Sequence, residues 1–192
     1  MKQSTSTLLT VKPYGFDYNK ETAEDNHFQT GGTGLSSSQI TRAALNEFEA
    51  LIKKISAHGI ELIVYDELAT KATPDAVFPN NWFSTHSDGS VYLYPMFAPN
   101  RRKERRQEVL NLLTQEYGFT IDRIKDWSKH EDVGLFLEGT GSLILDRPNR
   151  IVYAALSERT CEKLVRLYAK EIDYSLVLFT SHHKLNQKRV LI

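Results

Sequence analysis

Hydrophobic and polar positions form distinct blocks along the chain, and the first block contains the clearest helix. Between residues 39 and 59, apolar side chains recur at spacings of three and four, which predicts an amphipathic helix. Serines at 36–38 offer it an N-cap. A short apolar run at 8–11 comes earlier, residues 60–65 are predicted to form a buried strand, and the polar, glycine-containing segment 17–38 is predicted to be a loop.

The second block has the pattern of a hairpin followed by a helix and a further strand. Residues 76–85 and 91–94 are predicted strands, and the Asp88-Gly89 pair between them is a strong hairpin-turn signal. A helix is expected to begin near residue 101, with basic first turns and a leucine-rich apolar face. Residues 119–124 are expected to form the next strand.

The third block repeats this order. Strands are predicted at 142–145 and 151–156 around a turn at 146–149, followed by a helix at about 158–172 and a strand at 176–179. The three helices begin near residues 39, 101 and 158, so their spacing is about 60 residues. This spacing indicates three ββαβ repeats, and an ordinary open α/β sandwich is the alternative.

Composition narrows the class of function. Lys and Arg total 24, as do Asp and Glu, so no charge excess favours nucleic acid or an anionic membrane, and a small-molecule role is expected. The single cysteine, Cys161, cannot form an internal disulfide, which favours a reducing, cytoplasmic location. The N-terminus lacks a signal-peptide pattern, and no run of about 18 apolar residues predicts a membrane span.

Two stretches place polar groups among apolar neighbours. Asp75, Asn80 and Asn81 lie on the predicted strand 76–85 or at its start, where a carboxamide could both donate to and accept from a neutral planar ligand. The alternative is that the asparagines fix turn backbone around Pro79. Glu138 comes before two glycines at the start of a strand; when buried, it would need a partner and would suit the orientation of a catalytic histidine.

The arginines offer carboxylate-binding forks, whereas a nucleophile is harder to find. Residues 101–106 are strongly basic. Most of these side chains are expected to lie on a solvated helix face, and about one arginine is expected to contact a ligand. Arg159, at a strand-to-helix turn, is a similar candidate. Cys161 has no histidine nearby in the sequence, and the His182-His183 pair is expected to be exposed. No metal-ligand spacing is present, and neither a metal nor another cofactor is expected.

Taken together, these stretches resemble the amidinotransferase (pentein) superfamily, which includes arginine deiminases and dimethylarginine dimethylaminohydrolases. The resemblance is greatest to its citrulline-utilisation hydrolase branch and covers nearly all of the chain. It is carried by segments 21–29, 73–86, 94–96, 100–102, 137–142 and 157–160, of which the Pro-Asn-Asn-Trp-Phe and Glu-Gly-Thr-Gly-Ser strings are the most specific.

The resemblance implies a fold and a set of site residues. The fold is α/β, an incomplete five-bladed α/β propeller of about three ββαβ modules at about 6–66, 74–125 and 135–181 within a single domain, 1–192. The implied chemistry is hydrolysis of a guanidino or ureido group by a cysteine thiolate with a histidine as acid and base. Glu138 would position that histidine. The implied substrate-binding residues are Asp75, Phe78, Asn80, Asn81, Arg101 and Arg159.

Two departures from the family pattern qualify this expectation. Asn80 and Asn81 stand where guanidine-processing relatives carry acids, which favours a neutral ureido substrate such as citrulline. The family's histidine and cysteine are expected beyond Ile192, and neither Cys161 nor His182-His183 matches them. Three readings therefore stay open: a truncated, inactive hydrolase, a non-enzymatic binding module, and an enzyme completed by another chain. Self-association through uncovered module faces is also expected.

Overall fold

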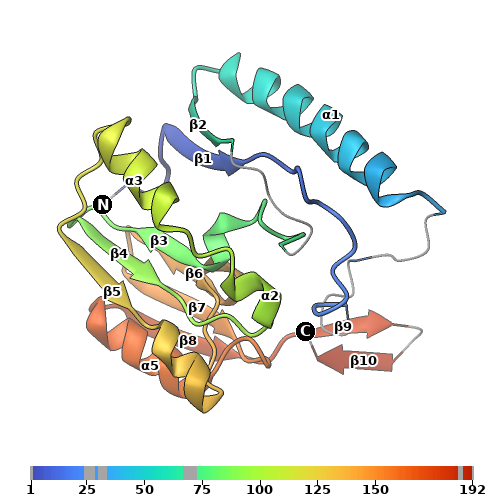
Figure 1. Ribbon diagram of the computed structural model, residues 1–192. Coiled ribbons are helices and arrows are strands. Elements are labelled where there is room, and N and C mark those ends of the chain that lie inside the picture. Colours follow the sequence, from blue (N-terminus) through green and yellow to red (C-terminus); the bar gives the residue numbers. More distant parts are fainter. Residues whose placement is uncertain (1, 24–28, 30–33, 67–72, 186–187, 192) are drawn as a thin grey trace. The chain divides into compact units, whose positions relative to one another are not determined.

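A computed structural model describes residues 2–23, 29, 34–66, 73–185 and 188–191 of the chain (Figure 1). The chain forms two compact units. The first consists of Met1–Gln3, Asn80–Phe97 and Ile121–Ile192, and the second consists of Ser4–Pro79 and Ala98–Thr120. The two units are described separately below.

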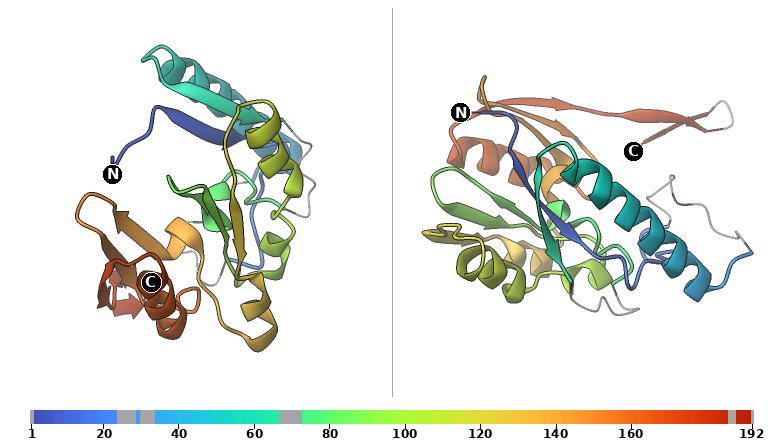
Figure 2. Two further views of the ribbon diagram at one scale, coloured as in Figure 1. Left: turned by 90° about the vertical axis from the view of Figure 1, so that its left-hand side faces the viewer. Right: turned by 90° about the horizontal axis from the view of Figure 1, so that it is seen from above.

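The second unit contains a parallel strand pair and a long helix. Strand β1 (Thr7–Val11) pairs in parallel with β2 (Glu61–Tyr65), and α1 (Ser37–Ser56) connects them. The two views in Figure 2 show α1 alongside this pair. Ser36 caps α1 through a capping box, in which its side chain accepts from the Gln39 amide while the Gln39 side chain accepts from the Ser36 amide. The predicted helix and its N-cap are therefore confirmed.

The apolar stripe of α1 is only partly covered. None of the helix residues is buried, and Leu51 is 51% exposed. Two shorter helices follow in the second unit, α2 (Pro99–Arg102) and α3 (Gln107–Gln115); α3 buries Val109, Leu110 and Leu113. The sequence predicts one helix beginning near 101, but α2 ends at Arg102, and Arg106 has an extended backbone and is the N-cap of α3.

The first unit contains two three-stranded sheets with the same strand order. Strands β3 (Phe83–Thr85) and β4 (Ser90–Leu93) form an antiparallel hairpin, and β5 (Arg123–Asp126) pairs with β4 in parallel. Strands β6 (Leu143–Asp146), β7 (Ile151–Ala155) and β8 (Ser175–Phe179) repeat the arrangement. Helix α5 (Glu162–Glu171) connects β7 to β8, so this sheet has the predicted ββαβ order (Figure 1).

Aromatic residues form the centre of the core in the first unit. Tyr92 of β4 and Tyr94, just after β4, contact Tyr168 of α5, with ring centroids 5.1 and 5.8 Å from it. Val152 and Leu164 pack into the same cluster and are fully buried. This packing joins α5 to both sheets and determines which face of each sheet is buried from solvent.

Both predicted hairpin turns are present. Gly89 adopts a positive φ of 74°, which a side chain would strain, and the Asp88 carboxylate accepts from the amide of Ser90. Asp146 accepts in the same way from the amide of Asn149 in the β6–β7 turn. These hairpins could be predicted from the sequence because their turns depend on local glycine and aspartate residues.

Several predicted boundaries are wrong. Residues 76–82 are not a strand: the Phe78 amide donates to the Asp75 carbonyl in a turn, the 3₁₀ helix η1 (Pro79–Asn81) follows, and β3 begins only at Phe83. Pro79 favours this outcome because it has no amide hydrogen for a strand ladder. The strand predicted at 119–124 is shifted to β5.

The two ends of the third block also differ from the prediction. Helix α5 begins at Glu162 because Ser157 and Thr160 form a small bridge before it, and Cys161 is the N-cap. After β8, the predicted polar stretch instead forms a hairpin of β9 (His182–Leu185) and β10 (Lys188–Leu191). Among the helices in the described parts of the chain, none has the length and apolar character needed to cross a membrane.

Candidate functional site

Glu138 is the most constrained polar side chain of the first unit. It is 1% exposed and precedes the short helix α4 (Gly139–Ser142). Its Oε1 accepts from the Phe97 amide at 3.0 Å, and its Oε2 accepts from the Asn81 side-chain amide at 3.1 Å. A buried carboxylate with these donors is held in one orientation, as the sequence analysis required.

Both asparagines contact the segment around Glu138. Asn81 is 6% exposed, whereas the Asn80 side chain is exposed and donates to the Thr140 hydroxyl at 2.6 Å and to the Asn81 side-chain oxygen at 3.2 Å. Both lie on η1, so the prediction that they lie on a strand is wrong. The Asn80-Asn81 pair and the Glu-Gly-Thr-Gly-Ser string nevertheless meet in space within the first unit.

Two glycines make this meeting possible. A Cβ at Gly139 would lie 2.2 Å from the Asn80 carbonyl oxygen and 3.0 Å from that of Asn81, and a Cβ at Gly141 would lie 2.4 Å from the Asn81 side-chain nitrogen. Separations this short are steric clashes. Glycine at 139 therefore lets the Glu138 segment approach the backbone of the asparagine pair.

Arg159 lies beside this cluster with much of its guanidinium in contact with solvent. Its Nη1 is 3.9 Å from Glu138 Oε2, at the limit of an ion pair, and its side chain is 32% exposed. Ser142 fixes the backbone here: its hydroxyl accepts from the Glu138 amide at 3.0 Å and donates to the Arg159 carbonyl at 2.8 Å. Ser142 was missed as a site residue, although its place at the end of the Glu-Gly-Thr-Gly-Ser string could have indicated it.

In the second unit, Asp75 belongs to a separate buried polar cluster. Its Oδ2 accepts from the Asn19 side-chain amide at 2.6 Å and from the Thr22 hydroxyl at 3.3 Å. Asn19 also exchanges side-chain hydrogen bonds with Asn100, and the Asn100 amide donates to Glu21 at 2.8 Å. Asn19 was missed because a lone asparagine in a polar loop carries no sequence signal.

Arg101 is buried in this same unit and is only 5% exposed. Its Nε and Nη2 form a fork onto the Glu104 carboxylate at 3.1 and 3.0 Å, and Nη2 also lies 3.4 and 3.2 Å from the Asp75 and Phe78 carbonyls. Most of the basic run 101–106 was expected to form a solvated helix face, but the Arg101–Glu104 pair is almost fully buried. The Phe78 side chain is itself exposed.

The nucleophile candidates are not arranged as a catalytic pair. Cys161 is half-buried, packs against the aromatic core of the first unit and donates its amide to the Phe136 carbonyl at 2.8 Å. His182 is exposed on β9, as predicted, while the side chain of His183 and the whole of His27 lie outside the description. Across residues 2–23, 29, 34–66 and 73–182, no group of three His, Cys, Asp or Glu side chains could hold a metal ion.

A buried hydroxyl network in the first unit was not predicted. The Ser84 hydroxyl lies 3.0 Å from His86 Nε2 and 2.7 Å from the Tyr94 hydroxyl, which donates to Tyr168 at 2.9 Å. Burial lowers the pKa of His86 to about 4, and the nearby Arg147 charge acts in the same direction. Burial raises the pKa of Tyr94 to about 12. His86 is therefore neutral at physiological pH.

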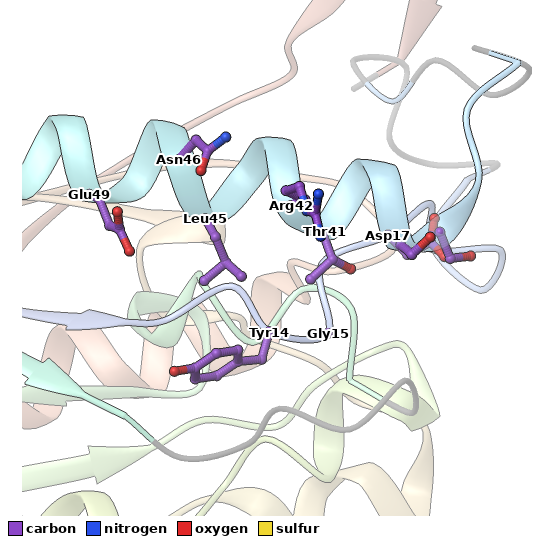
Figure 3. A pocket seen from close by; sticks show the side chains of 10 residues that line it. Tyr14, Gly15, Asp17, Thr41, Arg42, Leu45, Asn46 and Glu49 are labelled. Atoms are coloured by element: carbon purple, nitrogen blue, oxygen red, sulfur yellow. The ribbon is translucent and has the colours of Figure 1, made fainter.

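The second unit also has a pocket of about 450 Å³ between α1 and the turn near Gly15 (Figure 3). Tyr14, Thr41 and Leu45 face one another across it, and Arg42 and Glu49 lie on its rim. None of the predicted site residues lines this pocket. Its walls carry no thiol and no buried charged group, so it is not the site that the sequence analysis describes.

Comparison with solved structures shows the fold. The chain superimposes on the substrate-bound N-terminal domain of ArgZ, a cyanobacterial arginine dihydrolase, with a TM-score of 0.63 and 19% identity over 94% of this chain and 59% of that one. For the Pseudomonas aeruginosa DDAH bound to citrulline, the TM-score is 0.57 and the identity 12%, over 90% of this chain and 60% of that one. This chain thus spans about three-fifths of the length of these relatives and has the α/β pentein fold expected from the sequence.

Comparison with sequence families gives the relationship directly. No curated protein matches the chain. A family model described as "N,N dimethylarginine dimethylhydrolase, eukaryotic" matches residues 12–191, nearly the whole sequence. The predicted resemblance to the amidinotransferase superfamily is therefore confirmed, and the chain belongs to the N,N-dimethylarginine dimethylhydrolase family.

Proposed function

We propose that the chain binds an amino acid with a guanidino or ureido side group, and that a neutral ureido group of the citrulline type fits it best. The main support is the hydrogen bond from the Asn81 side-chain amide to the buried Glu138 carboxylate. Asn81 is a neutral donor to Glu138. An acid in place of Asn81 would add a second negative charge, which a cationic guanidinium would neutralise. With asparagine there, a neutral ureido group is sufficient.

The groups of the first unit have complementary roles in this proposal. Glu138 accepts through both oxygens and is held in one orientation, and its proposed role is to accept from an N–H of a ureido group or of a catalytic histidine. Arg159 has a side chain that is about one-third exposed, and its guanidinium fork fits a substrate carboxylate. Asn80 and Asn81 supply amide groups for a neutral planar group.

In the second unit, Asp75 and Phe78 are proposed as further substrate contacts. Asp75 is pre-oriented by Asn19 and Thr22, which lowers the entropy lost when a ligand binds. Phe78 exposes its ring beside the same turn and offers an apolar surface. These two assignments follow the family motif and are independent of those in the first unit.

Hydrolysis by this chain alone is not proposed. The solved relatives bind an arginine-type substrate or citrulline, as their descriptions state, and the chain spans about three-fifths of their length. Cys161, at the start of α5, packs against the core and is not joined to a histidine by a described contact. Binding of the amino acid is the function proposed for the described residues, and Cys161 is not proposed as a nucleophile.

Isothermal titration of the purified chain with citrulline and with arginine tests the binding. We expect saturable binding of citrulline, weakened by about tenfold or more in Arg159→Gln because a charged hydrogen bond to the carboxylate is lost. Arg166→Gln is the matched control, because Arg166 is an exposed residue of α5 paired with Glu162. Absence of saturable binding of either amino acid would reject the proposal.

The same samples test the catalytic part. We expect no turnover of citrulline or arginine, and Cys161→Ser is expected to bind as the unmodified chain does. Turnover that disappears in Cys161→Ser would instead make Cys161 the nucleophile.

A further inference from the structure

Two segments of the first unit meet beside the candidate site. Leu137 and Thr160 form an isolated antiparallel β-bridge. Residues next to such a bridge lie opposite each other, so Glu138 and Arg159 come together, with their charged groups 3.9 Å apart. An isolated bridge contributes few backbone hydrogen bonds, and side-chain contacts beside it are needed to hold this spacing.

The Ser142 hydroxyl supplies these contacts. Its oxygen accepts from the Glu138 amide at 3.0 Å and from the Thr160 hydroxyl at 2.8 Å, and its hydrogen is donated to the Arg159 carbonyl at 2.8 Å. A hydroxyl has one hydrogen and two lone pairs, so these three bonds saturate it, and an amide donor and a carbonyl acceptor fix their direction. Ser142 therefore ties the backbone of Glu138 to that of Arg159.

Thr160 fixes the orientation of the Ser142 hydroxyl. Its hydrogen takes one lone pair of the Ser142 oxygen, and its own oxygen accepts from the Ser157 hydroxyl at 3.2 Å. Thr160 is 3% exposed and Ser142 is 8% exposed, so a group that lost its partner here would not be compensated by bulk water. The hydroxyls of Ser142 and Thr160 thus form one buried, directed pair.

The side chains of the two site residues are held differently. The Glu138 carboxylate accepts from the Phe97 amide and the Asn81 side chain, whereas the Arg159 side chain is one-third exposed. A guanidinium that closed onto the carboxylate would form a short, two-bonded ion pair and would turn away from a ligand. A fixed Arg159 backbone opposes this closure, because it limits the positions that the guanidinium reaches.

We propose that Ser142 and Thr160 are positioning residues: their hydroxyls fix the backbone of Arg159 against that of Glu138 and so keep the Arg159 guanidinium available to a ligand carboxylate. Both hydroxyls are buried and act through Arg159 rather than on the ligand. The effect on ligand binding rests on the proposed function, whereas the effect on the two backbones does not.

A double-mutant cycle tests the effect on binding. Thr160→Val keeps the shape of the side chain without its hydroxyl, and we expect it to weaken citrulline binding by about threefold to tenfold in isothermal titration, while Thr160→Ser binds as the unmodified chain does. In Arg159→Gln, Thr160→Val should have little further effect, because the hydroxyl acts through the arginine. Ser175→Ala, which removes an exposed hydroxyl of β8, is the control.

Two results of this cycle would overturn the proposal. One is unchanged citrulline binding in Thr160→Val. The other is an equal loss from Thr160→Val in the unmodified chain and in Arg159→Gln, which a merely structural role would produce.

Amide exchange tests the two backbones without a ligand. The Cys161 amide donates across the bridge to the Phe136 carbonyl at 2.8 Å, and neither variant removes that acceptor. We expect its exchange to accelerate by about tenfold in Ser142→Ala and in Thr160→Val but not in Thr160→Ser, with the amides of β4 as the reference for intact folding. Unchanged exchange in both variants would overturn the proposal. If neither citrulline nor arginine binds the unmodified chain, the proposed function fails, and exchange alone decides whether the hydroxyls fix the backbones.

Discussion

At the scale of single residues, burial separates the charged site candidates into two groups that the sequence alone does not distinguish. Glu138 and Arg101 are both buried and fully partnered, whereas Arg159 keeps donors near solvent. The identity of these residues was predictable because charged groups stand out in apolar or glycine-rich strings. Their distant partners were not, since the Phe97 amide beside Glu138 and the Asp75 carbonyl beside Arg101 come from segments far away in the sequence and carry no local signal.

The buried imidazole of His86 makes a prediction at this scale. Its pKa is about 4 in the folded chain and about 6.5 in an unfolded chain, so the unfolded state takes up the proton first as the pH falls. The stability associated with the neutral ring is complete above pH 6.5 and is lost between pH 6.5 and 4. We expect this loss to be of the order of 2 kcal/mol in the free energy of unfolding.

Urea unfolding across that pH range measures the effect. His86→Gln removes the titration, so its stability should depend less steeply on pH between 6.5 and 4 than that of the unmodified chain. His58→Gln is the control, because His58 lies in the exposed turn after α1. Equal pH dependence in His86→Gln and the unmodified chain would contradict the assignment.

At the scale of elements, turn chemistry and helix periodicity were readable, and tertiary contacts decided the rest. Asp88-Gly89 identified the β3–β4 hairpin, and the spacing of apolar residues identified α1. The chain around Pro79 reads as a strand by composition, but the turn at Asp75 is fixed by Arg101, a long-range contact that no local pattern contains.

The close approach of α4 to η1 gives an element-scale prediction. Gly139→Ala should destabilise the chain by about 1–3 kcal/mol, because its Cβ would overlap the Asn80 carbonyl at 2.2 Å and backbone must move. Gly141→Ala should cost less, since its nearest neighbour is the side-chain nitrogen of Asn81, which can rotate away. Chemical denaturation of both variants measures the order, and an equal or smaller loss at Gly139 would contradict the packing.

At the scale of the whole molecule, the family could be recognised because its long motif strings survive in order. Hydrophobic periodicity predicted the order of strands in two sheets, whereas β1 of the first block pairs only with β2 among the described residues. The β9–β10 hairpin was not predicted, because its polar, basic sequence lacks the apolar alternation of a strand. Division of the predicted single domain into independent modules stays a prediction.

We expect self-association through an exposed apolar face of the β6–β7–β8 sheet. Ile144, Tyr153 and Val177 are register partners across β6, β7 and β8, so they share one face, on which Ile144 is 65% exposed. Sedimentation velocity should show association that increases with concentration and weakens in Ile144→Lys, with Asn149→Lys in the β6–β7 turn as control. A monomer at all concentrations would contradict this expectation.

The proposed preference for a neutral ureido group depends on Asn81. An aspartate at this position would stand about 3 Å from the Glu138 carboxylate, and two carboxylates so close are stabilised by a cation between them. The variant should therefore favour the guanidinium of arginine over the ureido group of citrulline.

The ratio of the dissociation constants for citrulline and arginine, measured by titration in the unmodified chain and in Asn81→Asp, tests the account most directly. The account predicts tighter binding of citrulline by the unmodified chain and a shift of about tenfold or more towards arginine in the variant. Tighter binding of arginine by the unmodified chain, or an unchanged ratio in the variant, would contradict it.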